Sequence, residues 1–333
     1  MDKESKLNSE LEANANQRRR FLKLTGGATV ALGASSVLAG CFGNGDDQNA
    51  GPPMDYPTPT PTPAPGPLGD ADVLNFALNL EYLEATFYSY AVFGTPLPTS
   101  QIGGTGTTGY AAMTPGHQVN FTDPVVRQYA KEIAQDEAAH VNFLRSALGT
   151  AAVAQPNLDL GFGPNSAFSA AARAAGLIGA GQSFDPYASD ENFLLAAFIF
   201  EDVGVTAYKG ASPLLTNKTY LEAAAGILAA EAYHAGLIRT TLYSKGVATP
   251  TLRTSADAIS NARDSLDGPS DDDQGISPVN NAANIVPADA NAIAYSRNTG
   301  QVLNIAYLNK LAVMRGGFFP DGVNGRINTS QAN

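Results

Sequence analysis

The chain has 333 residues, with 20 Lys and Arg against 31 Asp and Glu, so its formal net charge at pH 7 is −11. An acidic surface of this kind repels nucleic acid, and we expect no nucleic-acid partner. The chain has one cysteine, which excludes an internal disulfide, and its hydrophobic fraction of 44% allows a large core.

The N-terminal segment carries two export signals. The string QRRRFLK begins at Gln17, a glycine-rich apolar run follows, and LAGC ends at Cys41. The first string is similar to a twin-arginine signal, and LAGC is similar to a lipoprotein cleavage box whose cysteine becomes lipidated. Residues 1–41 are therefore predicted to be a signal peptide. The protein would be exported through the twin-arginine route and lipid-anchored at Cys41, facing the periplasm or on the cell envelope; an ordinary signal anchor is the alternative.

A linker and two helices follow. Residues 42–69 alternate proline with small residues, which is typical of an extended tether. Apolar residues with helical spacing predict a helix over 70–93 and another over 124–148, the second preceded by an N-cap and begun by a proline. The glycine-rich string between them lacks the lysine and the strand-to-helix context of a phosphate loop, so we interpret it as a plain connection.

Two further long helices are predicted at 189–209 and 217–245. A crossover over 150–189, with a short helix near 166–178, separates them from the first pair. Short loops within each pair and a long link between the pairs predict an all-α, four-helix bundle made of two helical hairpins.

The C-terminal third is rich in loops. A short helix near 255–266 and a fifth long helix over 299–315 are predicted. This extension has too few core residues to fold alone. Residues 70–325 are therefore predicted to form one domain, followed by a tail over 326–333.

Two strings with the same spacing dominate the domain. EAAH runs from Glu137 to His140, and EAYH runs from Glu231 to His234. Each spacing of three puts a carboxylate and an imidazole on one face of a helix. A single pair of this kind is more often a hydrogen bond at the surface. Two helices that each carry such a pair, together with one glutamate from each of two other helices, form the ligand set of a di-iron or di-manganese bundle.

The other two long helices supply those glutamates. Glu201 lies in an apolar run, and Glu81 and Glu84 lie in an equally apolar one. Tyr88 follows Glu81 by seven residues, as Tyr208 follows Glu201. We prefer Glu81 as the ligand for that reason; Glu84 is either the ligand in its place or a group beside the ligands. The two tyrosines are interpreted as buried hydrogen-bond donors to the centre rather than redox groups.

Other polar residues receive simpler interpretations. Asp136 and Asp202 adjoin predicted ligands in sequence, so they should point elsewhere, as solvated or capping groups. His117 is predicted to be an exposed loop residue. The acidic run at 271–273 is predicted to be a solvated loop, because its spacing does not match an EF-hand.

The chain resembles the ferritin-like superfamily, and more narrowly the ferritin-like proteins grouped with plant desiccation-related proteins. The strings LNFALNLEYLEATFY, EIAQDEAAHVNFLR, FEDVGVTAY and AEAYHAGLI carry the broader resemblance, and NTGQVLNIAYL and GGFFPDGVNG the narrower one. The resemblance implies a ferritin-like bundle whose metal ligands are Glu81, Glu137, His140, Glu201, Glu231 and His234. The C-terminal third has no equivalent in cage-forming ferritins, so a cage-type iron store is not expected.

Two functional hypotheses follow. In the first, the chain binds two Fe or Mn ions, since carboxylates and imidazoles suit these metals, and acts on peroxide or dioxygen in protection against oxidative or desiccation stress. In the second, it is a non-enzymatic stress protein of the envelope that binds metal or a partner. The sequence is compatible with a homo-oligomer.

Overall fold

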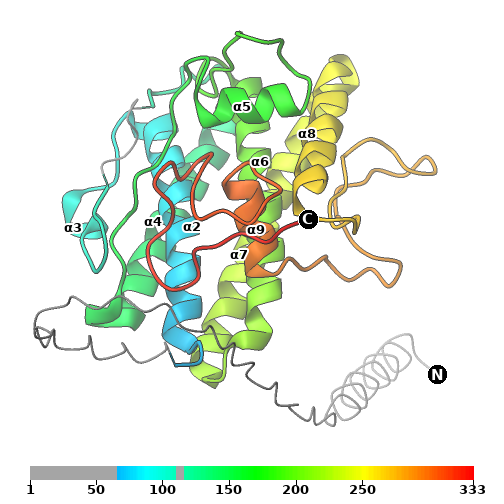
Figure 1. The fold of residues 1–333 in the computed structure, drawn as a ribbon. Helices are drawn as coiled ribbons and strands as arrows, with labels where there is room; N and C mark the ends of the chain where they lie inside the picture. The colour runs from blue at the N-terminus through cyan, green and yellow to red at the C-terminus, as the bar shows by residue number, and fades with distance from the viewer. Residues whose placement is uncertain (1–65, 110–115) are drawn as a thin grey trace, which may run out of the picture. The chain divides into compact units, whose positions relative to one another are not determined.

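The computed structural model describes residues 66–109 and 116–333; the predicted signal peptide, Cys41 and most of the linker lie outside this part of the chain. Within it the chain forms eight α-helices and no β-strand (Figure 1). Their bounds are α2 Asp70–Phe93, α3 Thr99–Ile102, α4 Pro124–Leu148, α5 Ala167–Ala174, α6 Asp190–Ala211, α7 Lys218–Ala248, α8 Thr251–Asp267 and α9 Thr299–Ala306.

Four long helices, α2, α4, α6 and α7, form the bundle, and this confirms the predicted fold class. α2 packs mainly on α4, and α6 packs mainly on α7. The short loop predicted within each pair is present only between α6 and α7; residues 94–123, including α3, connect α2 to α4. The helix starts follow the sequence signals: Asp123 accepts hydrogen bonds from the amides of Val125 and Val126, and Asn217 caps α7 in the same way.

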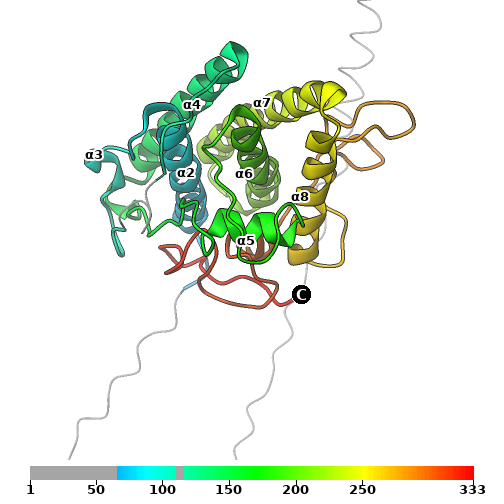
Figure 2. The ribbon, with the colours of Figure 1, turned by 90° about the horizontal axis from the view of Figure 1, so that it is seen from above.

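The four helices differ in how much of their surface is covered. Most residues of α2 and α6 are buried, whereas α4 and α7 each keep an exposed face. Figure 2 shows the reason: α5 and the C-terminal segment lie on one side of the bundle, next to α2 and α6, and α4 and α7 lie on the other. The sequences of α2 and α6 are therefore almost continuously apolar, and any charged side chain on these two helices needs a partner.

Several helix ends differ from the prediction by a few residues, and two of the differences have a clear cause. The fifth helix ends at Ala306 and not near Arg315, because Leu308 adopts a left-handed conformation with φ 52° that an α-helix cannot contain. Gly210 does not end α6. It lies inside the helix, where an added Cβ would be 1.9 Å from the carbonyl oxygen of Arg297, so glycine is required there for a close approach.

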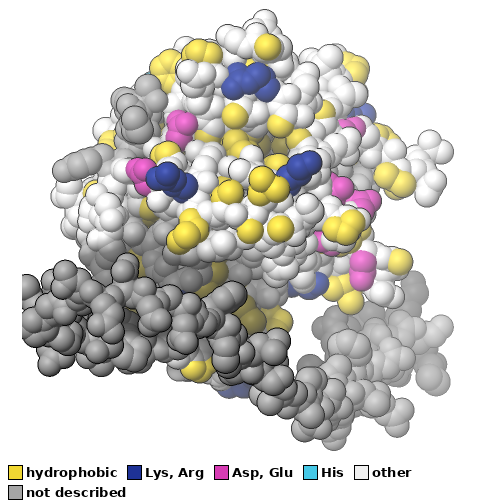
Figure 3. Space-filling model, viewed as in Figure 1, with side chains coloured by type: hydrophobic (Ala, Val, Ile, Leu, Met, Phe, Trp, Pro, Cys, Tyr) yellow, Lys and Arg dark blue, Asp and Glu magenta, His cyan; other side chains and the backbone are white. Residues whose placement is uncertain are grey.

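The C-terminal segment is held to the bundle by side-chain hydrogen bonds. Asn79 of α2 donates to the carbonyl of Asn324 at 2.8 Å and accepts from its amide at 3.0 Å. The described residues cluster as one compact unit. Figure 3 shows the face that this segment covers, where charged side chains are scattered among hydrophobic and uncharged ones. No described helix is both long and apolar enough to cross a bilayer.

Candidate metal centre

The bundle brings the six predicted ligands to one interior point. We call them the Glu–His cluster: Glu81 from α2, Glu137 and His140 from α4, Glu201 from α6, and Glu231 and His234 from α7. All four carboxylates are at most 1% exposed. The two imidazole ring centroids lie 6.2 Å apart. The side chains therefore face inward, as their spacing on each helix predicts.

Two overlapping groups of ligand atoms make up the cluster. One contains Glu81, Glu137, His140 and Glu231, and the other contains Glu137, Glu201, Glu231 and His234. In each group the atoms lie within 4.8 Å of one another. Glu137 and Glu231 belong to both groups. This is the arrangement expected of two cations that share two carboxylates.

Each imidazole turns Nδ1 toward the carboxylates. Nδ1 of His140 lies 3.3 Å from Glu81 Oε2 and 3.4 Å from Glu137 Oε2. Nδ1 of His234 lies 2.9 Å from Glu137 Oε1 and 3.6 Å from Glu201 Oε2. The polar atoms of the cluster thus converge, with the imidazole nitrogens set among carboxylate oxygens.

Eight buried atoms of the cluster have no hydrogen-bond partner among the described residues; the short contacts between imidazole Nδ1 and carboxylate oxygens would be hydrogen bonds only with a proton on Nδ1. The eight atoms are both carboxylate oxygens of Glu137 and of Glu231, Oε2 of Glu81 and of Glu201, and Nδ1 of each histidine. Buried polar atoms in native proteins are almost always paired, and a buried carboxylate without a partner costs several kcal/mol. A donor set of oxygens and imidazole nitrogens fits divalent iron or manganese.

The tyrosines pair across the bundle. Tyr88 of α2 donates to Oε1 of Glu201 on α6, and Tyr208 of α6 donates to Oε1 of Glu81 on α2. Each therefore holds the glutamate of the opposite helix and not the one seven residues before it. In both glutamates the tyrosine occupies Oε1 and leaves Oε2 directed at the cluster.

Glu84 and Gly204 lie beside the cluster. Glu84 is buried but belongs to neither group of ligand atoms. A Cβ on Gly204 would lie 2.4 Å from Oε2 of Glu231 and 3.5 Å from Oε1 of Glu84. Glycine at this position therefore leaves room for the carboxylate of Glu231, whereas Glu84 would be at ordinary contact distance from an added Cβ. The sequence analysis missed Gly204, although a glycine inside an apolar helix is a signal of close approach.

The side chain of Asp136 is 47% exposed, as predicted for a solvated group, but it also contacts the cluster, so the prediction that it points away from the ligands is wrong. Its Oδ2 lies 3.2 Å from Nε2 of His234. A proton on Nε2 would donate to this carboxylate, and in a neutral imidazole it would leave the Nδ1 lone pair available to a cation. Residues adjacent in a helix point about 100° apart, and Asp136 reaches an imidazole of α7 because α4 and α7 pack against each other.

The cluster strongly perturbs its own pKa values. Burial lowers the pKa of both imidazoles, but the neighbouring carboxylates outweigh it and raise the pKa of His140 to about 10 and of His234 to about 12. The imidazoles likewise overcome burial and lower the pKa of Glu137 to about 2. Burial and nearby carboxylates raise the pKa of Glu84 and Glu231 well above the ordinary range. Without a cation the site would have to bind extra protons, which metal ions would replace.

A second buried charged cluster lies next to the first, and we call it the Arg–Asp network. Asp202, predicted to be solvated or capping, is instead buried between Arg239 at 2.7 Å and Arg263 at 2.9 Å. Asp273, predicted to lie in a solvated loop, is buried and lies 2.7 Å from Arg263 Nε. Both predictions are wrong because the fold brings buried arginines to these carboxylates, from 37 and 61 residues away for Asp202 and from 10 and 24 residues away for Asp273. The network consists of Asp202, Asp267, Asp273, Arg239, Arg263 and Arg297.

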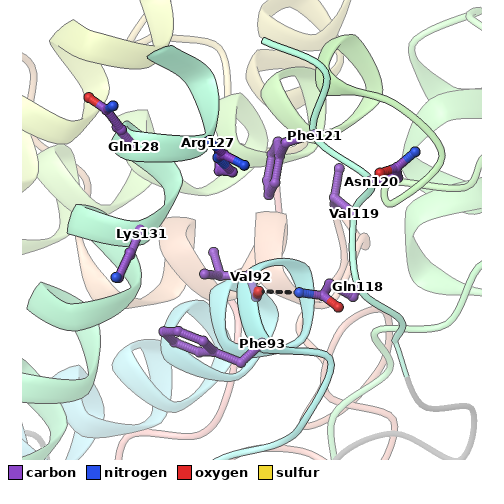
Figure 4. A pocket seen from close by; sticks show the side chains of 9 residues that line it. All are labelled: Val92, Phe93, Gln118, Val119, Asn120, Phe121, Arg127, Gln128 and Lys131. Carbon is purple, nitrogen blue, oxygen red and sulfur yellow. Dashed lines mark hydrogen bonds between the residues drawn. The ribbon is translucent and has the colours of Figure 1, made fainter. Parts of the chain in front are cut away.

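Two other features lie away from the cluster. His117 has a side chain that is 44% exposed and lies 3.0 Å from Asp185, as expected for a loop residue. Figure 4 shows a pocket of ≈680 Å³ between the end of α2, the segment 118–121 and the start of α4, where Arg127 and Lys131 are among the lining residues. None of the Glu–His residues lines it. This pocket is therefore separate from the candidate centre.

Comparisons with known proteins agree with this architecture. The model of the ferritin-like domain family matches residues 69–244. The chain is 35% identical over 179 residues to the desiccation-related protein PCC13-62 of Craterostigma plantagineum, which covers 52% of this chain and 53% of that protein. It is 28% identical over 272 residues to the ferritin-like catalase Nec2 of Nesocodon mauritianus, which covers 78% of this chain and 84% of that protein. The chain thus spans about half the length of the first relative and most of the second. No solved structure matches the chain.

Proposed function

Because this chain belongs to the ferritin-like domain family, we propose that its Glu–His cluster binds two Fe or Mn ions and that the protein consumes peroxide or dioxygen in stress protection. The observation that carries the proposal is the set of eight buried atoms without hydrogen-bond partners. The similarity to a ferritin-like catalase supports peroxide as the substrate.

The pattern of free oxygens suggests a role for each carboxylate. Glu137 and Glu231 keep both oxygens free and belong to both groups of ligand atoms, so they would bridge the two ions. Glu81 and Glu201 keep one oxygen free and would each bind one ion. Four carboxylates would bring four negative charges, which two divalent cations neutralise, and His140 and His234 would complete the shells as neutral ligands.

When bound, the metal ions supply redox chemistry toward peroxide or dioxygen. The chain contributes the arrangement around them. Tyr88 and Tyr208 fix the orientation of Glu201 and Glu81, and Asp136 fixes that of His234. The packed bundle keeps bulk water away from the carboxylates, which strengthens every charge interaction in the site.

Elemental analysis of the full-length protein tests the metal site. We expect about two Fe or Mn ions per chain in the wild type and loss of metal in the double variant Glu137→Ala/Glu231→Ala. The matched control is Glu132→Ala/Glu222→Ala, which removes exposed glutamates from the same two helices and should keep the metal. Equal metal content in all three proteins would exclude the proposed ligands.

A peroxide-consumption assay then separates the enzyme from its alternative. The similarity to a desiccation-related protein favours a non-enzymatic stress protein in which metal stabilises the fold or a partner is bound at the envelope. Metal-loaded protein that consumes neither peroxide nor Fe(II) in the presence of dioxygen would support that alternative.

The proposed location depends on the N-terminal signals. Arg18→Lys/Arg19→Lys should block export through the twin-arginine route, and Cys41→Ser should release the exported protein from the membrane fraction. Mass spectrometry of the mature N-terminus would identify the lipid. An unmodified cysteine in mature protein would contradict the lipid anchor.

A further inference from the structure

A small apolar cavity lies in the seam between α2 and α6. Its volume is ≈30 Å³, and it is lined by apolar residues of α2, α6 and α9, by Phe318, and by Glu84 and Gly204. Glu84 is the only ionisable side chain in this lining. A water molecule needs about 10–15 Å³ measured in this way. The cavity can thus hold a molecule about as large as two waters, such as hydrogen peroxide or dioxygen.

Gly204 connects the cavity to the Glu–His cluster. It lines the cavity on α6, and the position of its absent Cβ is 2.4 Å from Oε2 of Glu231. The same position is 3.5 Å from Oε1 of Glu84. The inner end of the cavity is therefore formed by Glu84 and Gly204, and Gly204 packs directly against Glu231, one of the two carboxylates that would bridge the metal ions.

The C-terminal segment builds the outer wall of the cavity. Val302, Ile305 and Ala306 come from α9, and Phe318 follows it. Phe318 is fixed by a 2.9 Å hydrogen bond from its amide to the carbonyl of Ala306 and by an edge contact with Phe200 at 4.9 Å between ring centroids. The wall is thus part of the packed fold, on the sparsely charged face that Figure 3 shows.

We propose that this cavity is the port through which a small neutral oxidant, hydrogen peroxide or dioxygen, reaches the Glu–His cluster. The inference rests on the proposed function and adds the route and the size limit of its substrate. Apolar walls admit a neutral diatomic molecule and disfavour ions, and hydrogen peroxide, which needs hydrogen bonds, would find a partner in the carboxyl group of Glu84. Glu84, at the inner end, is a positioning residue that hydrogen-bonds a peroxide next to the metal site.

The opposite side of the cluster has a different character. The His140 side chain is 13% exposed and that of Asp136 is 47% exposed, on α4. This polar edge suits the entry of metal cations. It is also the rival route for the oxidant, and an experiment has to distinguish the two.

The test fills the cavity by one methyl group. Val302→Ile adds this group in the cavity wall, and Val126→Ile is the control, because it makes the same change at another fully buried helical position outside the cavity. Ala306→Val is a second cavity-filling variant. Three quantities are measured on full-length protein: metal content, xenon binding, and the association rate of nitric oxide with the Fe(II)-loaded protein. Nitric oxide serves as a neutral diatomic probe that needs no turnover.

The wild type and Val126→Ile should bind xenon in the cavity, as dry apolar cavities do, and Val302→Ile should not. Metal content should be equal in all variants. Nitric oxide association should slow at least threefold in Val302→Ile and Ala306→Val only, and kcat/KM for hydrogen peroxide should fall by a similar factor. Glu84→Gln should raise KM for peroxide more than it lowers kcat, as expected for a positioning role.

Separate results would overturn the inference and the proposed function. Loss of xenon in Val302→Ile with an unchanged nitric oxide rate would exclude the cavity as the port and leave the His140 edge as the route. A metal-loaded wild type that binds nitric oxide through the cavity but consumes no peroxide or dioxygen would keep the port and overturn the enzymatic function. A wild type without metal would overturn both, and elemental analysis identifies that case.

Discussion

The Glu–His cluster and the Arg–Asp network are two buried charged clusters that meet at neighbouring residues of α6. Glu201 belongs to the first and Asp202 to the second. The network contains three arginines and three aspartates, so its charges balance without any other ion. The cluster contains four carboxylates and two imidazoles, and eight of its atoms have no hydrogen-bond partner.

This difference separates a structural charge cluster from a candidate metal site. Burial alone does not, because both sets of side chains are almost fully buried. In the network every carboxylate has at least one oxygen paired with a guanidinium, although Oδ1 of Asp202 and of Asp267 has no hydrogen-bond partner. In the Glu–His cluster the negatively charged groups outnumber the groups that can carry a positive charge. A missing positive charge, together with convergent free atoms, is what indicates a cation.

The largest effect is expected from the substitution Asp202→Asn. It removes the carboxylate shared by Arg239 and Arg263 and leaves two buried guanidinium groups short of a partner. Breaking a buried pair in this way costs about 3–5 kcal/mol. Urea unfolding should show this loss both with metal and after chelation, and the metal content of the folded variant should equal that of the wild type. A loss below about 1 kcal/mol would show that the network is not structural.

Metal removal should have a comparable effect on the wild type. A ligand held at about a thousandfold above its Kd stabilises the folded state by about 4 kcal/mol, so dialysis against a chelator should lower the unfolding free energy by that order. The control Glu132→Ala/Glu222→Ala should lose the same amount, whereas Glu137→Ala/Glu231→Ala should not respond to the chelator. If chelation left the unfolding free energy of the wild type unchanged, the proposal that metal ions supply the missing positive charge of the Glu–His cluster would be contradicted.

Local sequence signals predict the bundle and the composition of the cluster well. Helical spacing and caps place α2 and α4 at their observed bounds, and two identical spacings of Glu and His identify residues that the structure then brings together. These features depend on periodicity within one helix, which the sequence displays directly. The role of these residues as ligands stays a prediction.

Features that depend on tertiary neighbours were not predictable from the sequence. The spacing of seven between Glu81 and Tyr88 suggests a pair within one helix, yet Tyr88 contacts Glu201, which is 113 residues away. Asp202 finds Arg239 and Arg263, which are 37 and 61 residues later in the chain. Adjacency in a helix predicts only that two side chains point in different directions, and it does not predict which residues each side chain contacts in the folded protein.

A smaller change is expected from Glu231→Gln in chelated protein. The amide has nearly the shape of the carboxyl group and no charge, and without metal the pKa of Glu231 is raised well above its ordinary range by burial and neighbouring carboxylates, which favours the neutral acid. Unfolding free energies of the chelated variant and chelated wild type should agree within about 1 kcal/mol, in contrast to Asp202→Asn. With metal present, the variant should fall below the wild type, because one of the two carboxylates proposed to bridge the ions is lost. If Glu231→Gln lost similar amounts of unfolding free energy with and without metal, Glu231 would have a structural role like that of Asp202 and would not be a metal ligand.

The smallest loss of unfolding free energy is expected at a charged contact on the surface. Its comparison with the buried clusters shows how much burial increases the cost of removing a charge. Asp123 caps α4 and lies 3.3 Å from Lys245 Nζ. The hydrogen bond from the amide of Val125 has the largest effect on the pKa of Asp123; burial opposes it, but together with Lys245 this hydrogen bond lowers the pKa below its ordinary value of 3.8. Because the folded pKa is depressed, the stabilisation is present above pH 3.8 and is lost as the pH falls through the lower folded value.

Asn also caps helices, so the substitution Asp123→Asn removes only the charge. The variant should lose about 0.2–1 kcal/mol of unfolding free energy at pH 7, and less at high salt. The difference from the wild type should vanish below the folded pKa of Asp123. A difference that persists there, or that exceeds the cost of Asp202→Asn, would show that burial is not what makes the two inner clusters costly to disturb.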